Sequence, residues 1–104
     1  MAEFIQVLTT TDSRDEADAL GRGAVEARLA ACVQVFTVAS MFWWEGEVER
    51  ADEYLLAFKT KRELFGDLAG YLEEHHSYDV PEITAVPILD GSDAYLGWIA
   101  AETR

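Results

Sequence analysis

The spacing of apolar and polar residues alternates along the chain between patterns typical of strands and the repeat typical of helices. Residues 4–10 are rich in apolar and β-branched side chains, which predicts a first strand. Ser13 followed by Glu16 has the spacing of a capping box at a helix start. Apolar residues then recur every three or four positions, which predicts helices over residues 14–29 and 62–75.

The middle of the chain predicts a long β-hairpin. Residues 31–44 and 47–60 are two runs of strand-forming residues, separated by Glu45 and Gly46. The glycine accepts the positive φ that tight hairpin loops require. Both predicted strands are much longer than the usual strand of about five or six residues.

The last third of the chain predicts one more strand and a short helix. Pro81 ends any helical continuation, and a strand is expected over residues 83–89. Pro87 cannot donate a ladder hydrogen bond, so this strand is expected at a sheet edge. Ser92 is a candidate cap for a final helix. The order β-α-β-β-α-β with an extra C-terminal helix predicts an α+β, ferredoxin-like sandwich in one domain, residues 1–104.

The predicted hairpin is apolar on both of its faces, whereas a sheet with helices on one side usually has a polar outer face. Val35 and Met41 fall on one face of the first strand, and Phe36 and Phe42 on the other. Such an apolar surface and long unpaired edges predict self-association. In the alternative interpretation, the C-terminal helix wraps the hairpin within one chain.

Composition excludes some partners. The 104 residues include 20 acidic and 8 basic ones, a formal charge of −12, which disfavours binding to nucleic acid. There is no apolar run of about 18 residues, so no membrane span is expected. A single cysteine, Cys32, and no visible leader sequence fit a reducing compartment, and we expect a cytoplasmic protein.

The two histidines, His75 and His76, are adjacent at the end of the second predicted helix and are candidate ligands for copper or zinc. Neighbouring residues of a helix point about 100° apart, so both could reach one ion only where the helix has unwound. Asp79 could add an oxygen ligand, and Cys32 a soft sulfur ligand. In the alternative interpretation, one histidine interacts with the helix C-terminus, the other packs, and Cys32 is a small buried hydrophobe.

Aromatic and polar residues elsewhere suggest a ligand cleft or an interface between copies of the chain. The members of this set come from the hairpin, from the segment after the histidines and from the last helix: Trp43, Trp44, Glu45, Lys59, Tyr78, Glu82 and Trp98. Interface and core packing is the alternative role for the tryptophans. The chain has no glycine-rich phosphate loop, nucleophile elbow or H-E-x-x-H motif, and we expect no catalytic residues, no enzymatic activity and no organic cofactor.

Several segments together resemble the CutA divalent-cation tolerance family. They are residues 28–33, the Trp44-Glu45-Gly46 turn, residues 58–60, residues 76–83 and the ending 95–99. The resemblance runs from about Leu8 to Ile99. It implies a PII-like homotrimer of ferredoxin-like protomers and a response to divalent metals, copper in particular. Ser77 and Asp79 depart from the family's usual proline and glutamate, and Thr9 stands where some bacterial members have a cysteine ligand.

Two functions are therefore expected from different classes. The first is a trimeric divalent-cation tolerance protein that binds metal modestly through His75 and His76. The second is a PII-like, non-enzymatic binding module that recognises a small ligand or a partner protein at clefts between protomers.

Overall fold

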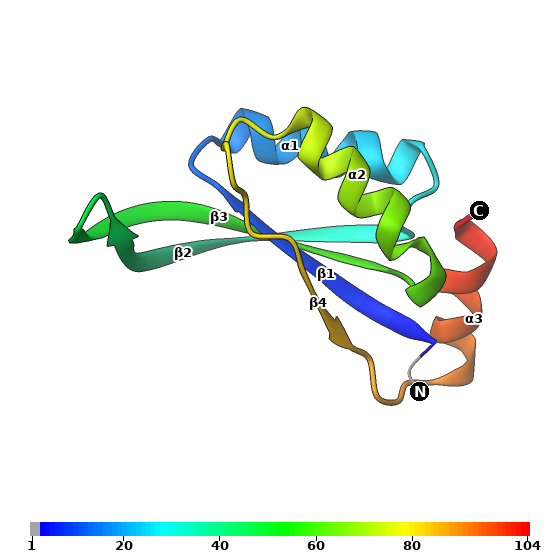
Figure 1. Ribbon diagram of the computed structural model, residues 1–104. Coiled ribbons are helices and arrows are strands. Elements are labelled where there is room, and N and C mark those ends of the chain that lie inside the picture. Colours follow the sequence, from blue (N-terminus) through cyan, green and yellow to red (C-terminus); the bar gives the residue numbers. More distant parts are fainter. Residues whose placement is uncertain (1–2) are drawn as a thin grey trace.

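The computed structural model describes residues 3–104 as a four-stranded antiparallel sheet with three helices (Figure 1). In chain order the elements are β1 (Phe4–Thr11), α1 (Arg14–Glu26), β2 (Cys32–Trp44), β3 (Glu47–Lys61), the 3₁₀ turn η1 (Arg62–Leu64), α2 (Phe65–His75), β4 (Thr84–Pro87) and α3 (Asp93–Glu102). The expected α+β order with a long hairpin and an extra C-terminal helix is confirmed.

The strands lie in the order β2-β3-β1-β4, so β2 and β4 are the edges of the sheet. The edge position that Pro87 predicts for β4 is confirmed, because this strand pairs only with β1. The strand is shorter than the expected range of residues 83–89. Pairing covers only Thr84–Pro87, and the chain turns away before Leu89, whose side chain is 94% exposed.

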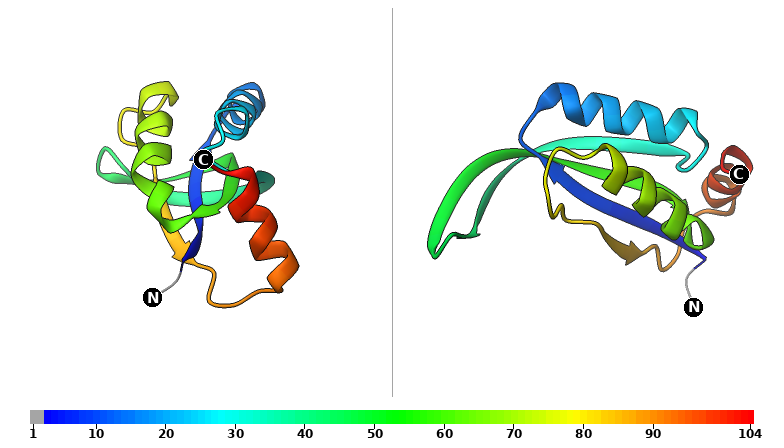
Figure 2. Two further views of the ribbon diagram at one scale, coloured as in Figure 1. Left: turned by 90° about the vertical axis from the view of Figure 1, so that its right-hand side faces the viewer. Right: turned by 45° about the horizontal axis from the view of Figure 1, so that its top comes forward.

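Helices α1 and α2 lie side by side on one face of the sheet (Figure 2). The core lies between them and the sheet, where Val7 and Phe58 face each other across β1 and β3 and are fully buried. Alternate residues on β3, such as Leu55 and Ala57, point to the opposite face. We call this opposite side of the sheet the outer face.

The start of α1 corrects one detail of the sequence interpretation. Ser13 caps the helix, because its hydroxyl accepts a hydrogen bond from the Glu16 backbone N–H at 3.2 Å. The capping box also predicts a reciprocal hydrogen bond, from the Ser13 backbone N–H to the Glu16 side chain, and this prediction is wrong. The Ser13 backbone N–H donates to the Thr11 hydroxyl, which leaves the Glu16 carboxylate free for other donors.

Helix α1 ends three residues earlier than the apolar pattern predicts. Arg28 adopts a left-handed backbone with φ of 63°, and the Leu29 N–H donates back to the Ala24 carbonyl. These are the features of a Schellman motif, which normally places glycine at this position. The Arg28 guanidinium donates to the Glu102 carboxylate at 2.7 Å, which connects the end of α1 to α3.

The hairpin of β2 and β3 extends well beyond the rest of the sheet. Pairing of β1 with β3 ends at Thr11 opposite Tyr54, so residues 38–53 form a two-stranded ribbon, which we call the arm. The turn at its tip has positive φ at Gly46, as expected, and also at Glu45. Helix α3 contacts β3 but lies at the far end of the molecule from the arm (Figure 1), so it covers the base of the hairpin and leaves the arm uncovered.

Within residues 3–104, no helix is long and apolar enough to cross a membrane.

Candidate functional site

The segment that follows α2 carries the candidate metal ligands. Helix α2 ends at His75, because His76 is extended, with φ of −79° and ψ of 142°. The backbone change that two adjacent histidine ligands would require is therefore present. Each ring nevertheless has its own partners within the chain, and these partners determine which nitrogen atoms remain available.

His75 is exposed and lies against its own helix. Its Nδ1 donates to the Tyr71 carbonyl at 2.9 Å, and its ring stacks on the Tyr71 ring with centroids 4.3 Å apart. The second nitrogen, Nε2, has no hydrogen-bond partner among residues 3–104. The sequence interpretation that one histidine meets the free carbonyls of a helix C-terminus describes His75.

The side chain of His76 is buried and uses both ring nitrogens. Its Nε2 donates to the Thr10 carbonyl at 2.9 Å, and its Nδ1 accepts from the Tyr78 backbone N–H at 3.0 Å. Pairing with β4 covers β1 only from Ile5 to Leu8, so Thr10 lies on the part of this edge that no strand covers. The imidazole thus takes the place of a strand partner for an otherwise open carbonyl.

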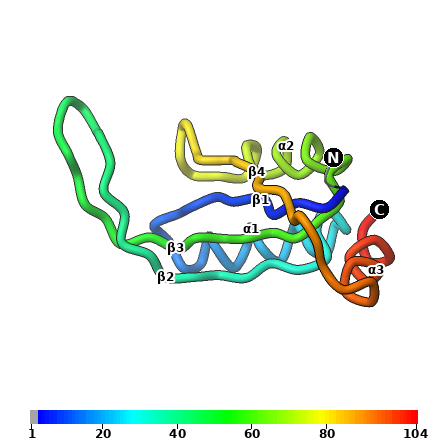
Figure 3. Tube along the Cα trace, turned by 90° about the horizontal axis from the view of Figure 1, so that it is seen from below, coloured from blue at the N-terminus to red at the C-terminus, as the bar shows by residue number. Residues whose placement is uncertain are grey.

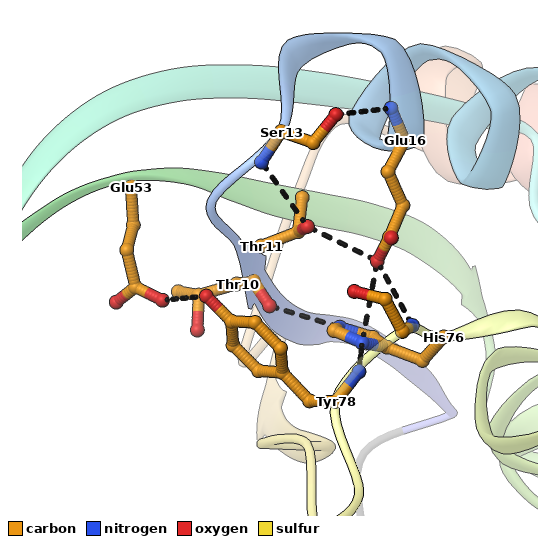
Figure 4. A network of polar contacts seen from close by, with 8 residues as sticks. Thr10, Thr11, Ser13, Glu16, Glu53, His76 and Tyr78 are labelled. Carbon is orange, nitrogen blue, oxygen red and sulfur yellow. Dashed lines mark hydrogen bonds and ion pairs between the residues drawn. The ribbon is translucent and has the colours of Figure 1, made fainter.

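The Glu16 carboxylate joins α1 to this segment (Figure 4). One of its oxygens accepts from the Thr11 hydroxyl at 3.0 Å and from the Ser77 backbone N–H at 3.2 Å, and lies 3.3 Å from His76 Nδ1. Burial raises the pKa of Glu16, but the hydrogen bonds from Ser77 and Thr11 outweigh it. The pKa therefore lies below the ordinary value of 4.5.

This lowered pKa predicts a loss of stability in acid. A carboxyl with a folded-state pKa below its unfolded value stabilises the fold above the unfolded pKa, and this contribution disappears as the pH falls through the folded value. We expect the free energy of unfolding to decrease below about pH 4.5, and less steeply in Glu16→Gln. Urea unfolding at pH 3.5 and pH 7 measures both slopes. Equal pH dependence in the two proteins would contradict this role for Glu16.

Tyr78 connects the same segment to the arm. Its hydroxyl donates to the Glu53 carboxylate at 2.7 Å, and Glu53 is only 7% exposed. Burial, the hydrogen bond to Glu53 and the negative charges of Glu53, Asp12 and Glu16 all raise the pKa of Tyr78 well above its ordinary value. The hydroxyl therefore keeps its proton, and its role as a donor, throughout the physiological range.

Cys32 lies at the other end of the sheet. It is half-buried, with its Sγ 3.6 Å from the Tyr95 hydroxyl of α3. The hydrogen bond with Cys32, together with burial, raises the pKa of Tyr95. Lys59 is directly opposite Cys32 in the strand register and donates to the Gln34 side-chain carbonyl at 2.6 Å. Lys59 is half-buried, and its partner is a neutral amide.

The remaining candidate residues lie apart from the histidines. Trp43 and Trp44 are 75% and 60% exposed near the tip of the arm, next to the exposed Glu45. Trp98 is 41% exposed on α3 and packs on Tyr95. Glu82 is exposed and accepts from the Thr84 hydroxyl at 2.9 Å. One chain therefore does not bring the tryptophans of β2 and Trp98 of α3 together, and a cleft that contains all three requires more than one copy.

The residues of one chain fit a divalent ion only weakly. Asp79 is exposed, both nitrogens of His76 are engaged, and Thr9, at the position of the family's cysteine, is fully buried with its hydroxyl unpartnered. Among residues 3–104, no group of three or more His, Cys, Asp or Glu side chains is arranged to hold a metal. The free Nε2 of His75 is the best available ligand, and the metal-binding role of the four candidate residues stays a prediction.

Sequence reasoning missed three residues of the polar network. Thr10, Glu16 and Glu53 come from β1, α1 and β3, and only the fold brings them to the histidine segment. The single available signal was Glu16, whose capping-box spacing marked it as a residue with a polar role at the start of a helix.

Comparison with known proteins gives a consistent result. The family model described as CutA1 divalent ion tolerance protein matches residues 5–102. The divalent-cation tolerance protein CutA of Archaeoglobus fulgidus is 39% identical over 99 residues, which cover 95% of each chain. A protein CutA homolog of Danio rerio is 44% identical over 95 residues, 90% of this chain and 63% of its own length.

The fold agrees with that of a solved relative. The Archaeoglobus fulgidus structure, described as a periplasmic divalent cation tolerance protein CutA, superposes with a TM-score of 0.95 at 36% identity. The match covers 97% of this chain and 99% of the other.

Proposed function

Because the chain belongs to the CutA1 divalent ion tolerance family, we propose that it acts as a non-enzymatic homotrimer that binds divalent metal ions modestly, copper in particular, and takes part in the response to them. The observation that carries this proposal is the family match over residues 5–102. The proposal places the protein in the cytoplasm.

Self-association is supported by what one chain leaves exposed. Helices α1 and α2 cover one face of the sheet only, and Phe36 and Val86 are 48% and 43% exposed on the outer face. Several large apolar side chains of the arm are also exposed: Met41, Phe42, Trp43, Trp44 and Val48. Apolar surface on this scale is typical of an association surface. The open edges of β2 and β4 offer backbone groups to the same neighbours.

Modest metal binding is supported by the free nitrogen of His75 and by the net charge of −12, which raises the local concentration of cations. A neutral imidazole is a good ligand for Cu(II) and Zn(II). A single histidine without a preformed ligand set predicts weak binding, because tight sites in proteins generally use about four ligands.

The metal prediction is tested by calorimetric titration of Cu(II) and Zn(II). We expect His75→Ala to weaken Cu(II) binding about tenfold, because the available imidazole is lost. Glu74→Ala is the matched control, since it removes a neighbouring exposed charge and leaves both histidines. Equal affinity for parent and His75→Ala would contradict the metal proposal. Equal weakening by both variants would assign the binding to surface charge alone.

The second candidate function is a PII-like binding module. The exposed Trp43 and Trp44 favour it, because aromatic side chains that remain in solvent are typical of recognition surfaces. In this function the clefts between protomers recognise a small ligand or partner protein. A thermal-shift screen of metabolites and nucleotides tests it. A stabilising compound whose effect disappears in Trp43→Ala supports this function, and no response across the panel argues against it.

A further inference from the structure

The arm leaves the domain at a position that the strand register defines. The last paired residue of β1 is Thr11, opposite Tyr54 of β3, and Tyr54 in turn is opposite Thr37 of β2. Beyond this row the arm has no neighbouring strand, and Figure 3 shows it turning out of the line of the sheet. A two-stranded ribbon is only marginally stable alone, so its direction depends on contacts at its base.

Glu53 is the first residue of β3 beyond that row, and it is buried although its neighbour Asp52 is exposed. The Tyr78 hydroxyl donates to the Glu53 carboxylate at 2.7 Å (Figure 4). A hydrogen bond to a charged acceptor is short and about twice as strong as a neutral one. The contact therefore holds the base of the arm to the segment that follows α2.

The other end of this connection is itself held in place. The Tyr78 backbone N–H donates to His76, His76 donates to the Thr10 carbonyl, and the neighbouring Ser77 N–H donates to Glu16. The segment 76–78 is thus joined by hydrogen bonds to β1 and to the start of α1. Tyr78 extends this set of hydrogen bonds to Glu53.

From this geometry we propose that the Tyr78–Glu53 hydrogen bond is a clamp that sets the direction in which the arm projects. Both residues act as positioning residues for the apolar side chains that the arm carries. The inference goes beyond the proposed function, because it requires neither metal nor a second copy of the chain.

The clamp also controls a cleft at the base of the arm. A hollow of about 410 Å³ is lined by residues on both sides of the last paired row, including Asp12, Thr37, Asp52 and Tyr54. Asp12 belongs to the domain, and Asp52 to the arm. A change in the direction of the arm changes the distance between these two carboxylates, so the clamp determines how open the hollow is.

The distance between two nitroxide spin labels, one on the arm and one on the domain, reports the direction of the arm. In a Cys32→Ser background, nitroxides are attached at Glu47→Cys on the arm and at Asp67→Cys on α2, two exposed positions. Labelled chains are diluted with unlabelled Cys32→Ser chains, so that distances within one chain dominate. No metal is added. The unmodified clamp is expected to give one narrow distance peak.

Tyr78→Phe removes only the donating hydroxyl, and loss of the narrow peak is the expected result. Glu53→Ala breaks the same bond from the other side and should broaden the distribution in the same way. Glu53→Gln keeps an acceptor oxygen and should retain the narrow peak. Tyr71→Phe, which removes a hydroxyl packed against Gly23 far from the arm, is the matched control.

Circular dichroism and the melting temperature establish that each variant is folded. A narrow, unshifted peak in folded Tyr78→Phe or folded Glu53→Ala would overturn the clamp. Broadening in Tyr71→Phe as large as in Tyr78→Phe would overturn it too, because the effect would then be a general loosening of the domain.

Discussion

Replacement of His76 by alanine is expected to lower the free energy of unfolding by about 2–4 kcal/mol, although the residue lies only one position beyond a helix end. Its side chain is completely buried, and it satisfies the Thr10 carbonyl and the Tyr78 N–H at once. The variant removes the protein partner of both part-buried groups, and each lost hydrogen bond costs about 0.5–1.5 kcal/mol. Loss of the ring's packing against Tyr78 adds to this cost.

The neighbouring histidine provides the matched control. His75 is exposed, and its hydrogen bond and stacking contact stay within its own helix. We therefore expect His75→Ala to cost less than about 1 kcal/mol. Urea unfolding at neutral pH, with a chelator present to exclude metal, compares the two. Similar costs for the two variants would show that the buried network around His76 does not contribute to stability as its geometry indicates.

This difference between the two histidines shows where sequence reasoning reaches its limit. The adjacent pair marked the segment correctly as a concentration of polar chemistry. The sequence could not show that the Thr10 carbonyl lies on an uncovered strand edge, because that depends on β4 being only four residues long. The Thr10 carbonyl and the Glu16 carboxylate, which bind this segment, lie 60 or more residues away from it in the sequence.

Local patterns predicted the elements well, because their causes are local. Helical periodicity, the hydroxyl caps at Ser13 and Ser92, and the edge signal of Pro87 each depend on residues within a few positions. Errors occurred where distant contacts decide the outcome. Arg28 ends α1 in a conformation that normally favours glycine, and its side chain pairs with Glu102 at the other end of the chain.

The hairpin illustrates both cases. Its length and the turn at Glu45-Gly46 were visible in the sequence, and apolar residues on both faces predicted surface that one chain does not cover. The exposed fractions of Trp43 and Phe36 agree with that prediction for a single chain. The contact at the base of the arm was not predictable, because Tyr78 lies 25 residues beyond Glu53 in the chain.

The second large effect is expected on self-association. Phe36 is 48% exposed on the outer face, where Leu55 of β3 lies directly opposite it. If copies of the chain cover this face, Phe36→Lys places a charge in an apolar interface, where it has no partner. We expect association to weaken about 100-fold, as for substitution of a central interface residue. Sedimentation equilibrium over a range of concentrations measures this change.

Ala19→Lys is the control, because it adds the same charge at an exposed position on α1, on the side of the sheet that its own helices already cover. It should keep the mass of the parent protein. If Phe36→Lys keeps that mass as well, the outer face is not the interface. If the parent protein itself is a folded monomer at micromolar concentration, the apolar outer face and arm do not serve self-association, and the trimer proposal fails with them.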